Sequence, residues 1–111
     1  RLWPTIRDRE ALLGRVLFGL ESARILGLRV IGTEQYPKGL GRTIEPILPL
    51  LDECFEKTSF SVAGESAMTS RLDQPGLRKL LLVGIEAHVC VQQSALDLLG
   101  SGFQVFVATD A

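Results

Sequence analysis

The most constraining feature of the sequence is a strand–helix–strand pattern near its end. Residues 79–83 form a continuous apolar run that stops at Gly84, which is typical of a central parallel strand buried on both faces. Apolar residues then recur at helical spacing between Cys90 and Leu99, and residues 103–108 form a second strand-like run. Two strands joined through a helix make a βαβ unit with parallel strands and a right-handed crossover. The pattern therefore predicts an α/β fold with a mostly parallel sheet.

The first part of the chain predicts a helix followed by a strand. Asp8 is a candidate cap at the start of the helix, and Gly27 suits the left-handed position just after its end. Residues 28–33 then predict a short strand. The apolar residues that recur at helical spacing, and that we expect to face the core, are Leu13, Val16, Leu17, Leu20 and Ala23.

The middle of the chain carries weaker signals. Two prolines interrupt residues 44–51, which predict only a short helix, and residues 55–62 are too polar for a buried strand. Residues 65–72 predict a brief helix. Because the chain opens on a helix and stops just after a strand, we expect residues 1–111 to form a single domain that is incomplete at both ends.

Charge and cysteine content exclude several classes of partner. The 12 basic and 13 acidic residues give a net charge of −1, which argues against binding to nucleic acid or to an anionic membrane surface. The two cysteines occur in no CxxC or Cys/His cluster, so the sequence predicts neither a disulfide scaffold nor a zinc site. With no apolar run of membrane-spanning length and no signal peptide, the expected location is cytoplasmic.

Cys90 is the best local candidate for chemistry. It lies where the strand at residues 79–83 gives way, through a short loop, to the first turn of a helix. Backbone N–H groups and the positive end of the helix dipole stabilise a thiolate at such a position, and the thiolate is the nucleophilic form. The alternative is a buried, inert cysteine, which is common in proteins. Cys54 has acidic neighbours that oppose a thiolate, so we expect it to serve packing.

Three groups of residues together resemble the isochorismatase-like hydrolases, a superfamily of cysteine hydrolases. They are residues 84–91 (GIEAHVCV) with 109–111 (TDA), residues 33–41 (TEQYPKGLG) and residues 56–60 (EKTSF), in the order of the family pattern. The resemblance spans essentially the whole chain. It implies a three-layer α/β/α sandwich of Rossmann-like type and an Asp-Lys-Cys catalytic triad.

The resemblance assigns two of the three triad residues to this chain. Cys90 falls on the nucleophile and Lys57 on the lysine, whose ammonium would stabilise the thiolate. Without the resemblance, Lys57 would be taken for a solvated surface charge. The family aspartate belongs to an Asp-x-Gln motif that precedes a segment like residues 1–6, so we expect it before this chain. Asp110 lies at a different strand end and does not replace it.

The resemblance also implies an oxyanion hole and a substrate pocket. The oxyanion hole is formed by the backbone N–H groups of Glu86 and Cys90, next to an expected cis peptide bond between Ile85 and Glu86. The residues expected to line the substrate pocket are Glu34, Gln35, Tyr36 and His88.

A metal site and a nucleotide cofactor are not expected. Nicotinamidase relatives carry an Asp-x-His metal motif, whereas this chain has Glu34-Gln35-Tyr36 in that region and a single histidine, His88. One histidine cannot supply the several converging ligands that zinc or iron requires. The sequence contains neither a dinucleotide-binding glycine motif nor a P-loop.

These expectations define a leading function and two alternatives. The leading function is a cysteine-dependent hydrolase of a small-molecule amide, or of a related C–N or vinyl-ether substrate, that forms a homo-oligomer. The first alternative is a non-catalytic member of the fold that binds a small molecule or a partner protein. The second is a redox-sensing thiol at Cys90.

Overall fold

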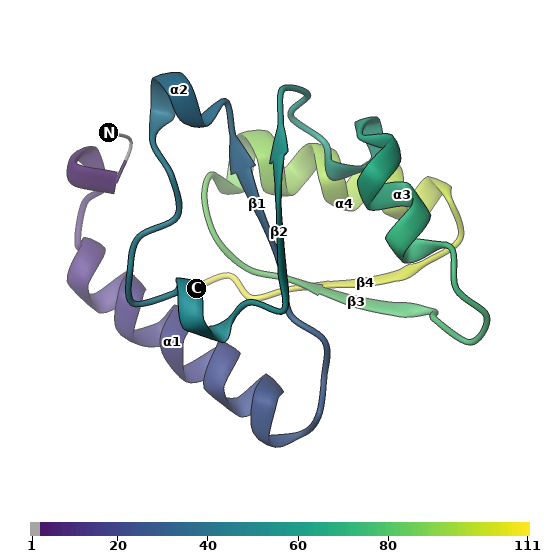
Figure 1. The fold of residues 1–111 in the computed structure, drawn as a ribbon, viewed down its shortest axis with the longest axis horizontal. Helices are drawn as coiled ribbons and strands as arrows, with labels where there is room; N and C mark the ends of the chain where they lie inside the picture. Colours follow the sequence, from purple (N-terminus) through teal and green to yellow (C-terminus); the bar gives the residue numbers. More distant parts are fainter. Residues whose placement is uncertain (1–2) are drawn as a thin grey trace. The chain divides into compact units, whose positions relative to one another are not determined.

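The computed structural model describes the backbone of residues 3–111 and the side chains of these residues except 3, 87 and 88. The chain divides into two compact units. One comprises the residues up to Thr58 together with Asp110–Ala111, and the other comprises Ser59–Thr109. Each unit contains one pair of parallel strands (Figure 1).

The first unit pairs strands β1 and β2 in parallel. Their register runs from Ile31 opposite Glu53 to Gln35 opposite Lys57. The buried apolar side chains of this unit include Val16 and Leu20 from helix α1, together with Val30. In chain order the elements are the 3₁₀ turn Trp3–Thr5, α1 (Arg9–Ile25), β1 (Ile31–Gln35), α2 (Pro37–Leu40), the 3₁₀ turn Leu48–Leu50 and β2 (Glu53–Lys57).

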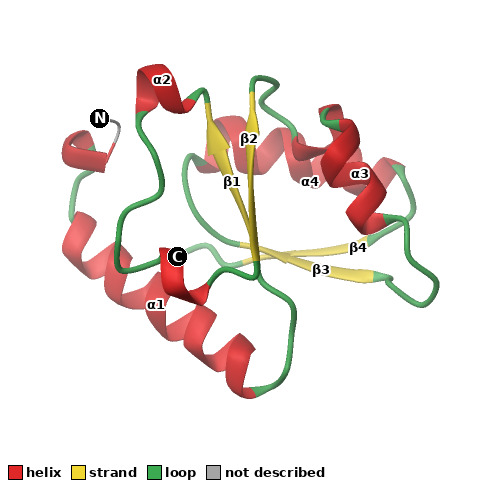
Figure 2. Ribbon diagram, viewed as in Figure 1, coloured by secondary structure: helices red, strands yellow, loops and turns green. Residues whose placement is uncertain are grey.

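The second unit is built around the parallel pair β3–β4. The register runs from Lys79 opposite Gln104 to Leu82 opposite Val107, and helix α4 connects the two strands (Figure 2). This confirms the βαβ unit that the apolar pattern predicts. In chain order the elements are the 3₁₀ turn Val62–Gly64, α3 (Ser66–Leu72), β3 (Lys79–Leu82), the π-helical turn Ala87–Val91, α4 (Gln92–Gly100) and β4 (Gln104–Val107). Its buried apolar side chains include Met68, Leu72 and Leu98.

Helix α1 turns the predicted face toward the core. All five apolar residues of the predicted stripe are buried or half-buried, whereas Phe18, on another side of the helix, is 75% exposed. The 3.6-residue period of the helix explains this sorting, because residues three and four apart share a face. Among the residues that the structure describes, no helix combines the length and the apolar character needed to cross a membrane.

Both long helices end in the same glycine-dependent arrangement. After α1, the Leu28 N–H donates to the Ala23 carbonyl at 2.8 Å and the Gly27 N–H donates to the Arg24 carbonyl at 3.0 Å, with Gly27 at φ +73°. This is a Schellman motif, and glycine adopts the left-handed conformation without a steric penalty. Gly102, at φ +96°, closes α4 with the equivalent bonds. The glycine prediction is thus confirmed at Gly27.

The start of α1 differs from the predicted cap. Asp8 occupies the N-cap position, but it has φ +53° and its side chain makes no capping hydrogen bond. Its carbonyl accepts from the Leu12 N–H at 3.0 Å, and Arg9 Nη1 donates to the Pro4 carbonyl at 2.8 Å. The backbone turn at residue 8 therefore connects to the helix without help from the carboxylate.

The bounds of one predicted strand need correction, and a second strand begins before the polar segment at residues 55–62 and includes its first residues. The predicted strand at residues 28–33 begins later, as β1, because Leu28 is part of the helix-closing motif. Residues 55–62 are predicted to be too polar for a buried strand, and their first three residues belong to β2, in which only Lys57 is buried. The polar residues of β2 are tolerated because strand alternation sends every second side chain to the solvated face, as the exposure of Cys54 and Glu56 shows.

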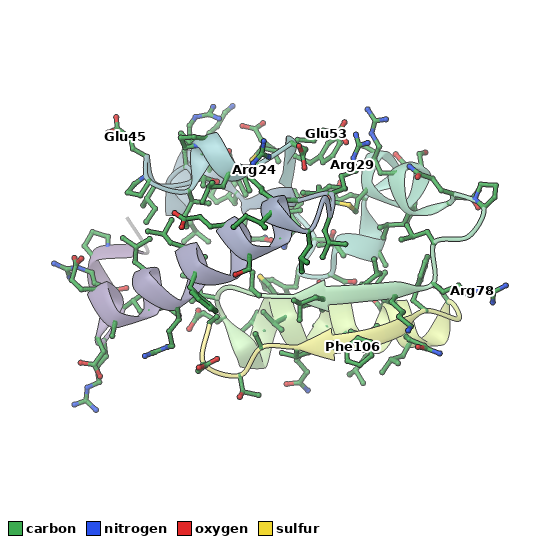
Figure 3. The ribbon with its side chains drawn as sticks, turned by 90° about the horizontal axis from the view of Figure 1, so that it is seen from below. Arg24, Arg29, Glu45, Glu53, Arg78 and Phe106 are labelled. Carbon is green, nitrogen blue, oxygen red and sulfur yellow. The ribbon has the colours of Figure 1, made fainter. Side chains whose placement is uncertain are left out.

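Strand β3 is not buried on both faces among the described residues. Leu81 is 62% exposed, and its register partner on β4, Phe106 (Figure 3), is 54% exposed. Among the described residues β3 pairs with β4 alone, so one face of the pair presents these apolar side chains.

Two alanine substitutions in and after α1 test the helix-closing motif. Gly27→Ala should reduce the free energy of unfolding by about 1–2 kcal/mol, because alanine is strained at positive φ while no atom crowds the site. Gly19→Ala, inside α1 and equally uncrowded, should raise it by about 0.5–1 kcal/mol. Urea denaturation of both variants measures the difference. Equal effects of the same sign would contradict the role of Gly27.

Candidate functional site

Lys57 is held at the carboxyl end of β2 by a side chain from β1. It is 4% exposed, and its Nζ donates a hydrogen bond to Gln35 Oε1 at 2.5 Å. The Gln35 amide in turn donates from Nε2 to the Thr58 carbonyl at 3.0 Å. A buried ammonium needs hydrogen-bond acceptors to offset lost hydration, and Gln35 supplies one. Lys57 is therefore a buried residue and not the solvated surface charge that its sequence context alone would suggest.

Glu34 lies on the opposite face of the β1–β2 pair from Gln35 and Lys57. Its carboxylate accepts from the Thr43 N–H at 2.7 Å, and Arg42 Nη1 lies 3.4 Å from it. Burial acts to raise the pKa of Glu34, but the Thr43 hydrogen bonds and the Arg42 charge outweigh it, so that the pKa lies below its ordinary value. Glu34 thus anchors the loop that follows α2.

Arg42 relieves a repulsion between two carboxylates. Glu34 and Glu56 are register partners on neighbouring strands, and like charges in such a position destabilise a sheet. The Arg42 guanidinium lies 3.4 Å from the Glu34 carboxylate and 3.3 Å from the Glu56 carboxylate. One exposed cation therefore joins a buried and an exposed anion at this position.

Tyr36 follows Gln35 directly and has an unusual backbone conformation. Its φ is +40°, in the left-handed region, and its N–H donates to the Lys57 carbonyl at 2.8 Å. The Tyr36 side chain lies against Gly39 so closely that a Cβ at residue 39 would come within 2.4 Å of Tyr36 Cε2. The residue is 55% exposed, so part of its side chain is available at the carboxyl end of β1.

Cys90 lies in a π-helical turn at the carboxyl side of β3. The loop begins at Gly84, with φ +117°, and contains the cis peptide bond expected between Ile85 and Glu86. The Val91 N–H donates to the Glu86 carbonyl at 3.1 Å, which closes the wide turn, and α4 follows without a break. Cys90 is half-buried. The prediction of a first-turn cysteine is confirmed in outline, with a π turn as the opening of the helix.

Cys54 has different surroundings from Cys90. Its Sγ lies 3.8 Å from Thr43 Oγ1, on the same face of the sheet as Glu34. Partial burial of the sulfur, and after it the Glu34 charge, raise the pKa of the Cys54 thiol above its ordinary value. The acidic influence expected there comes from Glu34 across the sheet. A thiol held in its protonated form is a poor nucleophile.

The structure brings some predicted site residues together and separates others within the first unit. Gln35 and Lys57 are in direct contact, Tyr36 adjoins them through the backbone, and Glu34 faces the other side. The predicted roles of Glu86 and Cys90 in an oxyanion hole remain predictions. The side chain of His88 lies outside the described residues.

Sequence reasoning missed the partners of Glu34. Arg42 and Thr43 lie in a loop with no periodic pattern, and nothing in the sequence indicates that their groups return to β1. The Gln35–Lys57 contact could have been inferred only if β2 had been recognised as the neighbour of β1. Among the side chains described, no group of three or more His, Cys, Asp or Glu residues is arranged to hold a metal ion.

Comparison with known proteins identifies the family. The isochorismatase domain model matches residues 5–111, so the chain belongs to the isochorismatase family. Isochorismatase domain-containing protein 1 from Danio rerio is 46% identical over 93 residues, a match covering 83% of this chain and 33% of the relative. Isochorismatase domain-containing protein 2 from Bos taurus is 43% identical over 93 residues, covering 83% of this chain and 45% of the relative.

Solved structures agree with this family. The MAR1 ribonuclease from Caenorhabditis elegans aligns with a TM-score of 0.88 at 38% identity, covering 97% of this chain and 56% of that chain. The YcaC gene product from Escherichia coli, described as an octameric hydrolase of unknown specificity, aligns with a TM-score of 0.85 at 25% identity, covering 99% of this chain and 57% of that chain. The α/β fold class is thus confirmed. The chain spans between a third and about half of the length of the curated relatives cited above.

The carboxylate network on β1 and β2 predicts a pH-dependent contribution to stability. The lowered pKa of Glu34 means that the folded state favours the carboxylate. Its contribution is full above the ordinary glutamate pKa and is lost as pH falls through the lower folded value. Arg42→Gln should therefore reduce the free energy of unfolding at pH 7, by less than about 1 kcal/mol because the guanidinium is exposed, and the loss should shrink below about pH 4.

Two further variants serve as controls for this effect. Glu56→Gln in the Arg42→Gln background should recover part of the loss, because it removes one of the facing charges. Arg78→Gln, at an exposed arginine of the other unit (Figure 3), should leave stability nearly unchanged. Urea denaturation at pH 7 and below about pH 4 measures the free energy of unfolding of each variant. A loss that stays constant with pH would contradict the carboxylate network.

Proposed function

We propose that the protein is a cysteine-dependent hydrolase of a small-molecule amide, or of a related C–N or vinyl-ether substrate. Cys90 is the nucleophile and Lys57 is its cationic partner. The observation that carries the proposal is the buried, hydrogen-bonded ammonium of Lys57 at the end of β2. Family membership supports it, as does the position of Cys90 in the turn after β3. In α/β sheets, sites gather at the carboxyl ends of strands.

The chemistry is a two-step acyl transfer when the substrate is an amide. The Cys90 thiolate attacks the carbonyl carbon, and the C–N bond breaks as the amine leaves with a proton. Water then attacks the resulting thioester, which releases the carboxylic acid and returns the thiol. A nearby cation lowers the free energy of the thiolate, and a carboxylate of the family triad would carry the proton.

Preference for Cys90 over Cys54 follows from their surroundings. The raised pKa of Cys54 keeps its thiol protonated, and Glu34 repels negative charge on that sulfur. Cys90 lies in the opening turn of a helical segment, where N–H groups and the helix dipole favour an anion. The backbone N–H groups of Glu86 and Cys90 are the proposed donors to the oxyanion of the tetrahedral intermediate.

The substrate pocket is proposed to include Gln35 and Tyr36. Gln35 extends from the same face of the strand pair as Lys57, and the Tyr36 side chain is partly exposed next to it. The proposed pocket also includes Glu34 and His88, as the family resemblance implies. Glu34 would act there mainly by holding the loop at Arg42 and Thr43. A homo-oligomer is the expected assembly, since the E. coli relative is described as octameric.

Substitution of the two proposed catalytic residues tests this function in the full-length protein. Cys90→Ala should reduce ammonia release from a panel of small primary amides at least about a thousandfold, because the nucleophile is lost. Lys57→Met should reduce it by about a hundredfold or more, because the thiolate loses its cation. Circular dichroism and the melting temperature establish that both variants remain folded.

The controls distinguish the alternatives. Cys54→Ser should retain nearly full activity, since its thiol is held protonated. Turnover that survives Cys90→Ala would contradict the cysteine-hydrolase assignment. Binding of amides without turnover by the wild type would favour the non-catalytic alternative. Because the C. elegans relative is described as a ribonuclease, single-stranded RNA is assayed as well, and Cys90-dependent RNA cleavage would contradict the small-molecule assignment.

A further inference from the structure

A cleft lies at the amino ends of β3 and β4, and all the residues that line it belong to the unit Ser59–Thr109. Helices α3 and α4 end at this cleft, and both strands begin there (Figure 1). Its volume is about 620 Å³, which is within the range of sites that hold small molecules. The size and position of the cleft therefore suit a small ligand.

The cleft is at the opposite end of β3 from Cys90. Arg78, which lines the cleft, directly precedes β3, whereas the turn that contains Cys90 follows the carboxyl end of this strand. Helix α4 begins just after that turn and ends beside the cleft, and its nine residues span about 14 Å. The cleft thus lies apart from the turn proposed to hold the nucleophile.

The walls of the cleft are formed by apolar side chains of the unit's core. Leu98 from α4 is 2% exposed, and Leu72 from α3 is 8% exposed. Leu77 and Phe103, which also line the cleft, are half-buried. A ligand with an apolar body would remove part of its own surface and part of these walls from water, which favours binding.

Two side chains of opposite charge lie on the rim of the cleft. Asp73 follows α3 directly, and Arg78 precedes β3. Neither forms an ion pair with another residue that the structure describes. Their backbones are held in place, because the Asp73 N–H donates to the Thr69 carbonyl at 3.0 Å and the Arg78 carbonyl accepts from the Gln104 N–H at 2.7 Å. Both charges are therefore available to a ligand at fixed points of the rim.

We propose that this cleft binds a small zwitterion with an apolar side chain, of the α-amino-acid class. The Asp73 carboxylate binds the ammonium group, which the negative ends of the α3 and α4 dipoles also favour. The Arg78 guanidinium binds the carboxylate, for which its paired N–H groups are suited. The apolar side chain of the ligand packs between Leu72 and Leu98. This site goes beyond the proposed hydrolase function and does not depend on it.

Calorimetric titration of the full-length protein with L-phenylalanine tests this site. Two analogues keep the aromatic ring but lack one charge each: 2-phenylethylamine has no carboxylate, and 3-phenylpropanoate has no ammonium group. L-Phenylalanine should bind saturably. Each analogue should bind about tenfold more weakly, because it loses one charge-assisted hydrogen-bonding group.

Two variants assign the charges to their partners. Asp73→Asn should weaken binding of L-phenylalanine and of 2-phenylethylamine about tenfold, and should leave 3-phenylpropanoate unaffected. Arg78→Gln should weaken binding of L-phenylalanine and of 3-phenylpropanoate, and should leave 2-phenylethylamine unaffected. Both residues are exposed, so both variants should fold, which circular dichroism checks.

Matched controls place the ligand in the cleft. Asp97→Asn, at an exposed acid of α4 outside the lining, and Arg7→Gln, at an exposed arginine of the other unit, should leave all three affinities unchanged. Alkylation of Cys90 in a Cys54→Ser background should also leave them unchanged.

Three results would overturn the inference. They are no saturable binding of L-phenylalanine below about 10 mM, loss of binding when Cys90 is alkylated, and an equal loss for all three probes in either variant. Because the analogues are compared on the wild type as well, the test does not depend on one variant. None of these measurements follows hydrolysis, so failure of this inference leaves the proposed function unaffected.

Discussion

The parallel pairing of β1 with β2 is the constraint on which the first unit depends. Because the register sets Gln35 opposite Lys57 and Glu34 opposite Glu56, strand alternation sends the two pairs to opposite faces. One face then carries a buried ammonium with a neutral acceptor, and the other carries two carboxylates joined by Arg42. A shift of one residue would exchange these faces and place a carboxylate beside the lysine.

The parts of the fold that could be predicted depend on short-range physics. The apolar stripe of α1 follows from the helical period, and Gly27 follows from the steric freedom that a left-handed turn requires. The β3–α4–β4 unit follows from an unbroken apolar run and a periodic segment. Each of these signals lies within a few residues along the chain. The structure therefore agrees with the sequence where the determining contacts are local.

The parts that could not be predicted depend on contacts between distant residues. Strand β2 is polar along most of its length, and it is recognisable only from its hydrogen bonds to β1. The family pattern indicated Lys57 and Cys90 as site residues, but it gave no reason for Lys57 to be buried or for Gln35 to contact it. The tie from Glu34 to Thr43 is formed by a loop, and loop positions leave no periodic signal in a sequence.

The packing of Tyr36 on Gly39 has a consequence for sequence variation. A methyl group at residue 39 would collide with the tyrosine ring, so the two positions share one limited space. We expect them to covary among related proteins, with a larger residue at position 39 accompanied by a smaller side chain at position 36. The side-chain volume at the carboxyl end of β1 would then be set in part by a residue three positions away, and exchange of this pair would change the shape of the surface there.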